Sequence, residues 1–384
     1  MNKVIYISVV GDLGNVASSG VHSKILAQIA AINGIGLQCK GLLAVKNLEY
    51  ASATNDVDYF EVNRGVFGYD FKTFFDVALV EVGLCKPDLV YIRYPLASIA
   101  VLEFVRRVKK YYPKVNILVE KQTLEVKELL STVSFRNMAL ILRELALRKC
   151  VLSCVDYVIC VTREISEYNL KIGAVNVLVM GNGIDGSLIE TEVIHQSTDS
   201  DIVRLAYVGN LAKWSSLSAF VDYLAVRKFR VDGKNIVLDI VGGGIQEKLY
   251  SDLSRKYEAV EYHGYLEGSR LHEVLRSSDY CLGSFGNYKR GLSESSNLKL
   301  RLYCALGIPF IYFDYDADFD DDSLRRVAVL LDSDVRQDYL FDLVLERIFD
   351  DTDLAARSKL LIEFATKNLT WEAKFTKLFL ELNL

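Results

Sequence analysis

The sequence predicts an α/β protein of two domains, each built on a parallel sheet covered by helices. Short apolar runs alternate with segments of helical periodicity along most of the 384 residues. Several of these runs pass directly into a polar or glycine-rich loop, as strands do at the ligand-binding edge of such a sheet. A polar stretch at 186–202 divides the chain into two parts of similar length. A chain of this length is expected to form two or three domains.

The two parts differ in charge. Residues 1–185 hold 21 Lys and Arg against 18 Asp and Glu, and the remainder holds 24 against 32. The whole chain has a net charge of -5, so binding to nucleic acid is not expected. The contrast between the halves is consistent with two domains that have different partners.

The seven cysteines have no regular spacing and lie among apolar neighbours, which predicts reduced thiols in a cytosolic protein. Cys150 and Cys154 have the spacing of two metal ligands, but no second pair completes a site, so no metal is expected. We expect no signal peptide, and no apolar run is long enough to cross a membrane.

The first domain is predicted to open with a buried strand at 4–10, a loop rich in Gly and Ser, and a helix with apolar residues between 25 and 32. This order is that of a Rossmann-like unit, although the glycine fingerprint of dinucleotide sites is not met. Gly20 and His22 lie where the loop enters the helix. A surface residue at the start of a helix explains His22 equally well.

Further segments of the first domain follow the same alternation. Strands are predicted at 42–45, 89–92, 117–119, 157–161 and 177–179, and an amphipathic helix at 96–110. Arg93 follows a strand at the edge where open α/β sheets bind ligands, although a plain surface cation is the alternative. The basic helix at 135–149 has two interpretations. It is either a membrane-surface helix or, as we prefer from the sequence, a core helix with its arginines in solvent.

The second domain is predicted to contain strands at 205–208, 236–241, 280–282 and 310–313. The strand at 236–241 runs into three glycines, Gly242–Gly244. Either a nucleotide approaches the backbone closely there, or the glycines only form a tight turn. The acidic segment at 314–322 is expected to be a solvated surface, because it lacks the ligand order of a calcium loop.

The stretch 283–309 is the most informative in the chain. A polar loop with Lys289 and Arg290 leads to Ser295–Asn297, residues that cap helices, and to a predicted helix at 298–306 that stops at Gly307. A helix N-terminus beside two cations is a favourable place for a phosphate group. An exposed pair of loop cations is the plainer alternative.

This stretch resembles the donor-site motif of retaining glycosyltransferases of family 4, which have the GT-B fold. Glu294 matches the first of the two glutamates of that motif, and Leu302 stands where the second is usual. The other matching positions are Lys299, Tyr303, Ala305, Gly307 and Pro309. Asn182–Asp185 is similar to the turn that ends the N-terminal domain of this family, and the resemblance extends from about Val4 to the last helix.

The resemblance implies an architecture of two Rossmann-like domains that face each other across a cleft. The expected boundaries are 1–186 for an acceptor-side domain, 203–354 for a nucleotide-sugar donor domain, and 355–384 for helices that return to the first domain. It also implies transfer of a sugar, with retention, from a nucleotide-sugar, expected to be a UDP-sugar, to a saccharide or lipid-linked saccharide. Surface polysaccharide or glycan synthesis is the implied setting, with no metal cofactor. A cytoplasmic protein with peripheral membrane contact through its first domain is expected.

The resemblance also implies site residues, in three groups. The implied catalytic residues are Glu294, Arg290 and Lys299. The implied donor-binding residues are Gly209, Asn210, Lys213, Gly242, Gly243, Gly244, His263, Gly264, Tyr265, Lys289, Ser295, Ser296, Asn297 and Leu298. The implied acceptor-side residues are Gly20, His22, Arg93 and Asn182.

The sequence departs from the family pattern at Leu302 and at Asn210, where an Arg is usual, and it has no His near Lys121. These departures keep an alternative open: an inactive or weak GT-B subunit that binds a partner glycosyltransferase. A nucleotide-sugar epimerase of the same fold is a second alternative. Transfer that depends on an added acceptor separates the three.

Overall fold

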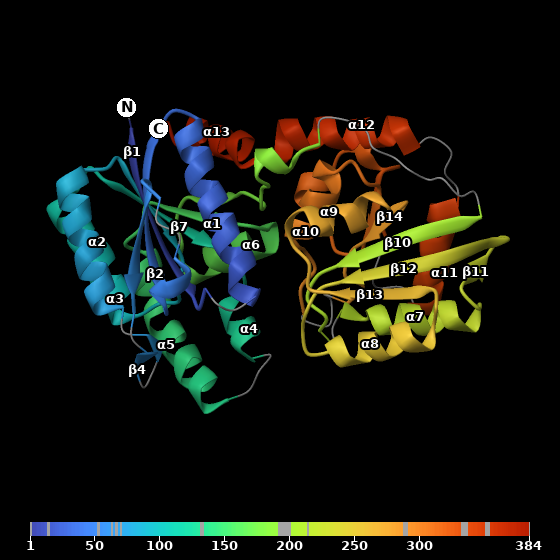
Figure 1. Cartoon of the computed structure of the whole chain (residues 1–384). Coiled ribbons are helices and arrows are strands. Elements are labelled where there is room, and N and C mark those ends of the chain that lie inside the picture. The colour runs from blue at the N-terminus through green and yellow to red at the C-terminus, as the bar shows by residue number, and fades with distance from the viewer. Residues whose placement is uncertain are drawn as a thin grey trace. The chain divides into compact units, whose positions relative to one another are not determined.

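A computed structural model describes residues 2–13, 16–51, 54–62, 64–65, 68–69, 71–130, 134–190, 201–212, 215–286, 291–331, 337–349 and 354–383. The chain divides into two compact units, each drawn in Figure 1 with a sheet covered by helices. The first unit comprises Met1–Gly181 and Trp371–Leu384, and the second comprises Asn182–Thr370. The α/β class and the two Rossmann-like bodies expected from the sequence are confirmed.

The first unit is built on a seven-stranded parallel sheet in the order β3-β2-β1-β6-β7-β8-β9. The strands are β1 (Lys3–Gly11), β2 (Gln38–Val45), β3 (Val57–Glu61), β6 (Leu89–Arg93), β7 (Asn116–Lys121), β8 (Tyr157–Cys160) and β9 (Val177–Val179). A separate antiparallel pair is formed by β4 (Arg64–Gly65) and β5 (Gly68–Tyr69). Every strand predicted for this domain is present, because continuous apolar runs are what a sheet buried on both faces requires.

The helices of the first unit are α1 (Val16–Gly34), α2 (Lys72–Cys85), α3 (Ile99–Tyr111), α4 (Glu125–Leu130), α5 (Phe135–Leu152), α6 (Arg163–Ile172) and α13 (Trp371–Glu381). In Figure 1, α2 and α3 cover one face of the sheet and α1 the other, with α13 beside α1. Helix α3 illustrates why these segments are helical. The Ser98 hydroxyl caps it by accepting a hydrogen bond from Val101 N, and its last turn carries Lys109 and Lys110.

Helix α13 completes the core of the first unit from a distant part of the sequence. Its Trp371 and Phe375 are buried among residues of β1, β6 and α1. Phe375 meets Tyr91 edge-on with ring centroids 6.0 Å apart, and Tyr91 stacks on Tyr6 at 4.7 Å. Such aromatic contacts stabilise beyond the area they bury. The core of the first unit therefore depends on residues that follow the whole second unit.

The second unit contains a second seven-stranded sheet with the order β11-β12-β10-β14-β15-β16, to which β13 is added beside β12. All its pairs are parallel except β11 with β12. The strands are β10 (Ile202–Val208), β11 (Arg230–Val231), β12 (Lys234–Val241), β13 (Val260–Gly264), β14 (Tyr280–Leu282), β15 (Phe310–Tyr312) and β16 (Ala328–Leu330). The four runs predicted as strands are confirmed.

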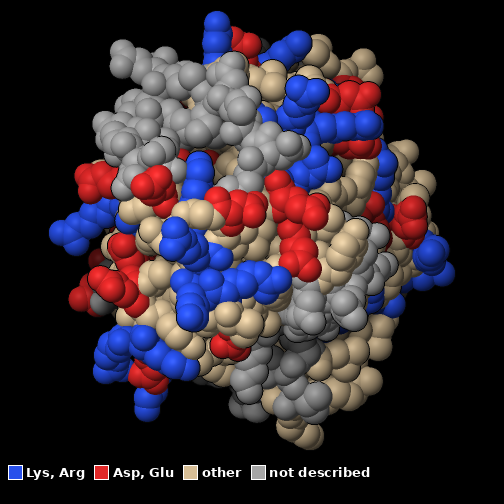
Figure 2. Space-filling model, turned by 90° about the vertical axis from the view of Figure 1, so that its right-hand side faces the viewer, with Lys and Arg blue, Asp and Glu red and all other residues tan. Residues whose placement is uncertain are grey.

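The helices of the second unit are α7 (Leu217–Val226), α8 (Glu247–Lys256), α9 (Gly268–Arg276), α10 (Leu298–Ala305), α11 (Gln337–Phe349) and α12 (Leu354–Phe364). Short 3-10 turns occur at Leu48–Tyr50 in the first unit and at Gly186–Leu188, Ala317–Phe319 and Asp322–Leu324 in the second, and α12 continues as a π-helix over Ala365–Leu369. Figure 2 shows the side on which β10 and β12 begin. Cations and anions interleave on that side, so the surplus of acidic residues does not form one patch there.

The two ends of the second unit lie together. Ile184 forms a parallel bridge with Thr370, and Ile184 N donates a hydrogen bond to Leu369 O at 2.8 Å. The helices of 355–384 were expected to return to the first domain. Helix α12 instead packs against α10 within the second unit, and α13 belongs to the first unit. The boundary between the units falls at Asn182, earlier than the polar stretch used to divide the sequence.

Candidate functional site

A candidate site lies at the carboxyl ends of β10, β14 and β15. Lys299, in the first turn of α10, is partly buried there and donates a hydrogen bond to Ser284 Oγ at 2.9 Å. Its ammonium group lies 4.0 Å from the ring centre of Tyr207, the penultimate residue of β10. A methyl group added to Gly209 would come within 3.6 Å of the same nitrogen. The amine is therefore held at the edge where open α/β sheets bind ligands.

The surroundings of Lys299 alter its protonation. Burial lowers the pKa of Lys299 to about 7, against the opposing effect of the Asp314 carboxylate. Asp314 is itself buried. The lysine therefore titrates near neutral pH, and an anion placed beside it would favour its charged form. Its neighbours Ser284, Tyr207 and Asp314 were not predicted as site residues, because their relation to Lys299 appears only when three strands align.

Helix α10 is fixed to the sheet by its tyrosine. The Tyr303 hydroxyl accepts a hydrogen bond from Val208 N at 3.1 Å and donates one to Leu282 O at 3.3 Å. The helix begins after Asn297, as expected, but the Asn297 side chain donates to Ser295 Oγ and does not cap the helix. The helix N-terminus is thus held by tertiary contacts and not by a local cap.

Asn182 is joined directly to the donor motif. Its backbone N donates to Ser296 Oγ at 2.7 Å, and its side-chain amide donates to Ser296 O at 2.5 Å. Arg301 Nε donates to Asn182 O at 2.9 Å. The structure therefore groups Asn182 with Ser296 and not with the acceptor-side residues of the first unit.

Arg301 is fully buried and forms an ion pair with two aspartates. Its guanidinium binds both carboxylate oxygens of Asp316, one of them at 2.9 Å, and also binds Asp318. Asp316 is buried as well, with only 2% of its surface exposed. The acidic segment at 314–322 was expected to be solvated, and this expectation is wrong for Asp314 and Asp316. The reason is that basic residues of α10 supply the countercharge: Arg301 binds Asp316, and Lys299 lies near Asp314.

The glycines of the second unit pack against one another. A Cβ on Gly242, which has φ +140°, would lie 1.9 Å from Gly209 O, and one on Gly244 would lie 2.5 Å from Asn210 Oδ1. Leu211 N donates to Gly243 O at 2.9 Å. The loops after β10 and β12 thus meet backbone to backbone, which only glycine permits. This contact explains why glycines stand at 242 and 244, and it brings Gly209 and Asn210 beside them.

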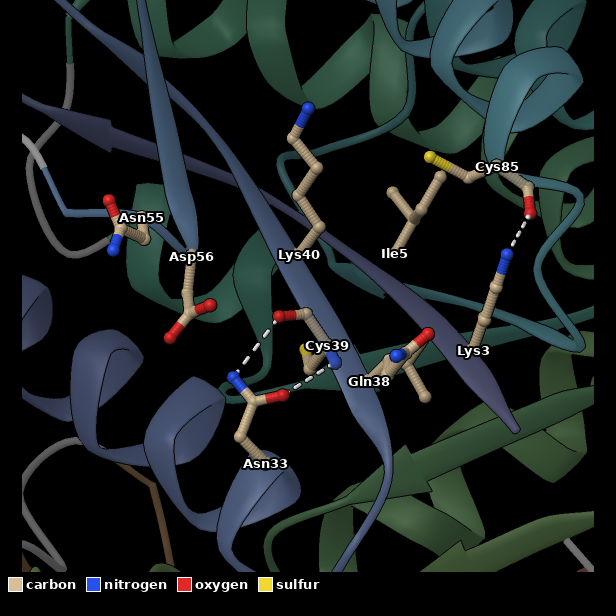
Figure 3. Close-up of a pocket in the computed structure, with 10 residues that line it drawn as sticks. Lys3, Ile5, Asn33, Gln38, Cys39, Lys40, Asn55, Asp56 and Cys85 are labelled. Atoms are coloured by element: carbon tan, nitrogen blue, oxygen red, sulfur yellow. Dashed lines mark hydrogen bonds between the residues drawn. The ribbon is translucent and has the colours of Figure 1, made fainter. Parts of the chain in front are cut away.

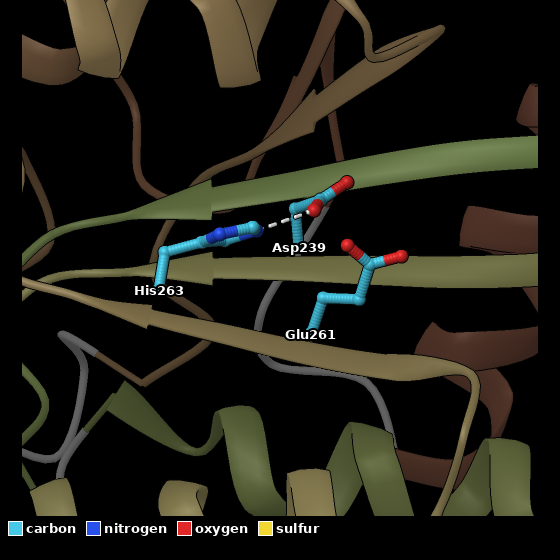
Figure 4. Close-up of side chains that lie close together, drawn as sticks. All are labelled: Asp239, Glu261 and His263. Carbon is cyan, nitrogen blue, oxygen red and sulfur yellow. Dashed lines mark hydrogen bonds and ion pairs between the residues drawn. The ribbon is translucent and has the colours of Figure 1, made fainter.

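The side chain of His263, on β13, points toward Asp239 on the neighbouring strand β12, as Figure 4 shows. Its Nε2 lies 2.6 Å from Asp239 Oδ1, and this hydrogen bond raises the pKa of His263. Arg204 binds Asp239 at 2.8 Å and Glu261 at 3.2 Å. Three side chains here have metal-ligand spacing, but Arg204 already forms ion pairs with both carboxylates. The cluster therefore makes no case for a metal ion.

The remaining predicted donor residues have varied positions. Glu294 forms a bridge with Tyr315, and Ser295 N donates to Tyr315 O at 2.9 Å. Leu298 and Tyr265 are exposed, and Gly264 has φ +69° and accepts a hydrogen bond from Gly242 N. Lys213, Lys289 and Arg290 lie outside the described residues.

The acceptor-side residues of the first unit lie on α1 and at the end of β6. His22 Nε2 lies 2.8 Å from the Tyr59 hydroxyl, and burial lowers the pKa of His22. Gly20 is exposed, with open space around its Cα. Arg93 is the last residue of β6 and pairs in the ladder with Glu120.

A cavity of about 330 Å³ in the first unit lies at the opposite, amino ends of β1 and β2. Figure 3 shows hydrogen bonds within two pairs of its lining residues. Asn33 exchanges hydrogen bonds with the backbone of Cys39, and Lys3 donates to Cys85 O. Lys40 is paired with Asp58 at 2.8 Å. These satisfied groups give no indication of a ligand.

Helix α5 differs from the interpretation preferred from the sequence. Its buried residues are Ile141, Glu144, Val151 and Leu152. The adjoining side of the helix carries an exposed apolar stripe of Phe135, Met138, Leu142 and Leu145, which are 88%, 42%, 64% and 45% exposed. The arginines were expected to be solvated, but Arg143 and Arg148 are half-buried. The core-helix interpretation is therefore wrong for the apolar residues of this stripe. Among the described helices, none combines the length and apolarity that crossing a bilayer requires.

Comparison with known proteins identifies the architecture. No protein-family model matches the chain, and no curated protein matches it. Solved structures do match. Sucrose-phosphate synthase from Thermosynechococcus elongatus has a TM-score of 0.69 at 14% identity, with 100% of this chain and 99% of that chain covered. The lipopolysaccharide outer core galactosyltransferase WaaB gives 0.66 at 14%, with 99% of both chains covered. HepE from Anabaena in complex with UDP gives 0.64 at 12%, also with 99% of both covered.

These likenesses extend over the whole chain and show its fold. The two parallel-sheet bodies have the architecture of GT-B glycosyltransferases. At this level of identity, the likeness reaches no further than the fold.

The buried ion pair of Arg301 yields a prediction about stability. Arg301→Met leaves Asp316 buried without its cation, which is expected to lower the free energy of unfolding by about 3–5 kcal/mol. The matched control is Arg325→Met, which breaks the exposed pair with Asp322 and is expected to change stability by less than about 1 kcal/mol. Urea unfolding at pH 7 measures both. A second change, Asp316→Asn in the Arg301→Met chain, is expected to recover part of the loss. Equal effects of the two single variants would contradict the assignment.

Proposed function

We propose that the protein is a glycosyltransferase that transfers a sugar, with retention, from a UDP-sugar to a saccharide or lipid-linked saccharide. The observation that carries the proposal is the amine of Lys299, which the first turn of α10 holds at the carboxyl edge of the second sheet. It occupies the matched position of the donor motif, in a fold whose solved relatives include proteins in complex with UDP. Fixed cations and helix N-termini stabilise a leaving diphosphate without reorganisation.

The proposed roles follow from this placement. Lys299, Lys289, Arg290 and Lys213 supply positive charge to the diphosphate, with the backbone at the start of α10. Glu294 binds hydroxyls of the donor sugar. The glycine loops at 209 and 242–244 form the floor of the nucleotide site, which Ser295–Leu298 border. No resident cofactor is part of the proposal, and surface glycan synthesis is its proposed setting.

An inactive subunit that binds a partner glycosyltransferase is the second candidate. The observation in its favour is Leu302, which packs against the core of the second unit where the family motif has a glutamate. A cytoplasmic protein that touches the membrane through its first unit belongs to the primary proposal. The surface proposed to make this contact is the exposed stripe of α5.

Sugar transfer by the isolated chain tests the proposal. Thermal-shift screening with UDP, GDP and nucleotide-sugars identifies the donor, because a bound ligand stabilises the folded state. Transfer from that donor is then expected without added metal and in the presence of a chelator. If transfer is lost in chelator and returns when Mg²⁺ or Mn²⁺ is added, the expectation that no metal is needed would be contradicted. Binding without transfer to any acceptor would favour the inactive subunit, and turnover without an acceptor would favour an epimerase.

Lys299 yields a prediction of pH dependence. Because the pKa of free Lys299 is about 7, diphosphate binding restores its charge and takes up a proton above that pH. UDP affinity is therefore expected to fall as the pH rises from 7 to 9, approaching tenfold per unit. Lys299→Met is expected to bind UDP roughly ten- to a hundredfold more weakly, since a charge-assisted bond is lost. The UDP affinity of Lys299→Met is expected not to change between pH 7 and 9. Isothermal titration measures both, and a flat profile for the wild type would refute the assignment.

The same amine predicts a change in stability. The pKa of Lys299 is lower in the folded state than its ordinary value of 10.5, so unfolding takes up a proton between pH 7 and 10.5. The free energy of unfolding is thus expected to rise with pH in this window in the wild type. Lys299→Met removes that contribution. Urea unfolding of the wild type and of Lys299→Met at pH 7 and 9 measures this contribution without any ligand. The gain in the free energy of unfolding between the two pH values is expected to be larger in the wild type.

Glu294 and Leu302 are expected to behave oppositely. A glutamate at 302 would bind the ribose, which does not react, so Leu302→Glu is expected to lower the donor KM and leave kcat unchanged. Leu302 is partly buried against apolar residues, so some loss of stability accompanies the change. Glu294→Ala is expected to lower kcat strongly. Steady-state kinetics with the identified donor compare them. If no donor binds the wild type and Leu302→Glu restores neither binding nor turnover, the inactive-subunit candidate replaces the primary one.

The stripe of α5 is expected to bind vesicles. Leu142→Asp with Phe135→Asp places two charges in the stripe and is expected to abolish cosedimentation with vesicles that contain anionic phospholipid. Val226→Asp, at an exposed apolar residue of the second unit, is the control and should have no effect. Undiminished binding of the double variant would exclude the stripe as the membrane contact.

A further inference from the structure

The carboxyl edge of the first sheet contains an unusual concentration of polar atoms that lack a partner. Nine buried side-chain polar atoms among the described residues have no hydrogen bond, and five of them are together here. These are Ser8 Oγ, Tyr91 Oη, Arg93 Nε, Glu120 Oε2 and Gln122 Nε2, of which the Tyr91 hydroxyl and the Glu120 carboxylate lie close enough to interact with each other. Buried polar groups almost always have partners, so this concentration calls for a cause.

The sheet brings three of these side chains to one face. Arg93 of β6 pairs with Glu120 of β7, and Ile7 of β1 pairs with Ile92, so Ser8 follows at the level of Arg93. Residues paired across parallel strands point to the same side of the sheet. Ser8 and Glu120 are each about 1% exposed, whereas Arg93 and Gln122 are partly exposed. Arg93 and Gln122 therefore connect this group of side chains to solvent, and Ser8 and Glu120 lie in the interior.

The direction of the Gln122 amide is fixed by its neighbour. Lys24 Nζ, on α1, lies 2.6 Å from Gln122 Oε1. An ammonium group has only protons to donate, so the carbonyl oxygen of the amide must face it. Gln122 Nε2 then points away from Lys24 as an unused donor.

The Glu120 carboxylate is largely occupied by the protein itself. Its Oε1 accepts hydrogen bonds from Gln28 at 3.2 Å and from Lys24 at 3.4 Å. Burial opposes its charge, but Lys24 and Arg93 together hold the pKa of Glu120 below its ordinary value. Burial first and the Glu120 charge second raise the pKa of Tyr91, so its hydroxyl keeps its proton beside the carboxylate.

What remains for a ligand is a set of donors. Arg93, Gln122 and Ser8 each have an unused N–H or O–H group, and two cations against one carboxylate leave one positive charge. Ligand groups that accept several hydrogen bonds and carry negative charge match this set.

We propose that Ser8, Arg93 and Gln122 form a binding position for an oxyanion, a carboxylate or phosphate group carried by the acceptor. The inference rests on the proposed function and narrows its acceptor to an acidic or phosphate-bearing saccharide. Lys24 and Glu120 hold the position in shape, Lys24 by orienting Gln122 and Glu120 by balancing the two cations.

The test is equilibrium binding to the whole chain, with sodium glucuronate, glucose 1-phosphate and glucose as probes. Two variants remove the position. Gln122→Glu keeps an oxygen for Lys24 but replaces the donor by a negative charge, and Arg93→Gln removes the guanidinium. Arg106→Gln, on the exposed side of α3, changes the net charge by the same amount and is the matched control. Thermal unfolding establishes that each variant is folded.

One or both anionic probes are expected to bind the wild type more tightly than glucose does. Both variants are expected to lose at least about tenfold of that affinity, and the control to lose none. Glucuronate alone would identify a carboxylate, and glucose 1-phosphate alone a phosphate. Equal binding of all three probes, or unchanged binding in both variants, would overturn the proposal. Ordered water would then be the partner of these polar side chains. UDP affinity is measured separately and reports on the donor site of the second unit. If UDP does not bind the wild type, the proposed function fails; if only the anionic probes fail to bind, the oxyanion position fails.

Discussion

The buried contact between Arg301 and Asp316 determines the shape of the second unit around its candidate site. One guanidinium joins three separate segments: the start of the unit at Asn182, the helix α10, and the acidic turn after β15. A charged group without solvent is stable only when its countercharge and hydrogen bonds are complete. Because these partners come from distant segments, none of the three can shift without unbalancing the others. The N-terminus of α10, and with it Lys299, is positioned by this balance more than by local helix signals.

The two units use buried charge at the same place in their folds. In the second unit the polar groups include Lys299, Ser284 and Asp314, and in the first they are Lys24, Glu120 and Arg93. Each group stands where parallel strands end, so the loops that follow leave room for side chains that the sheet interior would exclude. Hydrophobic packing fixes the strands, and the polar groups occupy the edge that packing leaves open.

The sequence was sufficient for most of the sheets, because a strand buried on both faces must be apolar throughout. The runs at 4–10 and 236–241 therefore predicted β1 and β12 correctly. The sequence was not sufficient to predict which charged residues are buried. Arg301 and Asp316 are 15 positions apart, and each alone has the pattern of a solvated residue. Only the fold brings them together. For the same reason, Gln122 and Ser8 had no signal beyond their places at the ends of strands, whereas Arg93 attracted attention because it is charged. The exposed stripe of α5 was misjudged because periodicity gives the width of an apolar face but not what covers it.

The paired ends of the second unit affect how the protein forms during synthesis. All residues of the second unit emerge in one continuous piece, from Asn182 to Thr370, and their ends meet at Ile184 and Thr370. The first unit is interrupted, and its core lacks Trp371 and Phe375 until α13 leaves the ribosome. The unit that is translated first is thus the last to close its core. A nascent chain that stalls before residue 371 would present a complete second unit beside a first unit with its aromatic core open to chaperones.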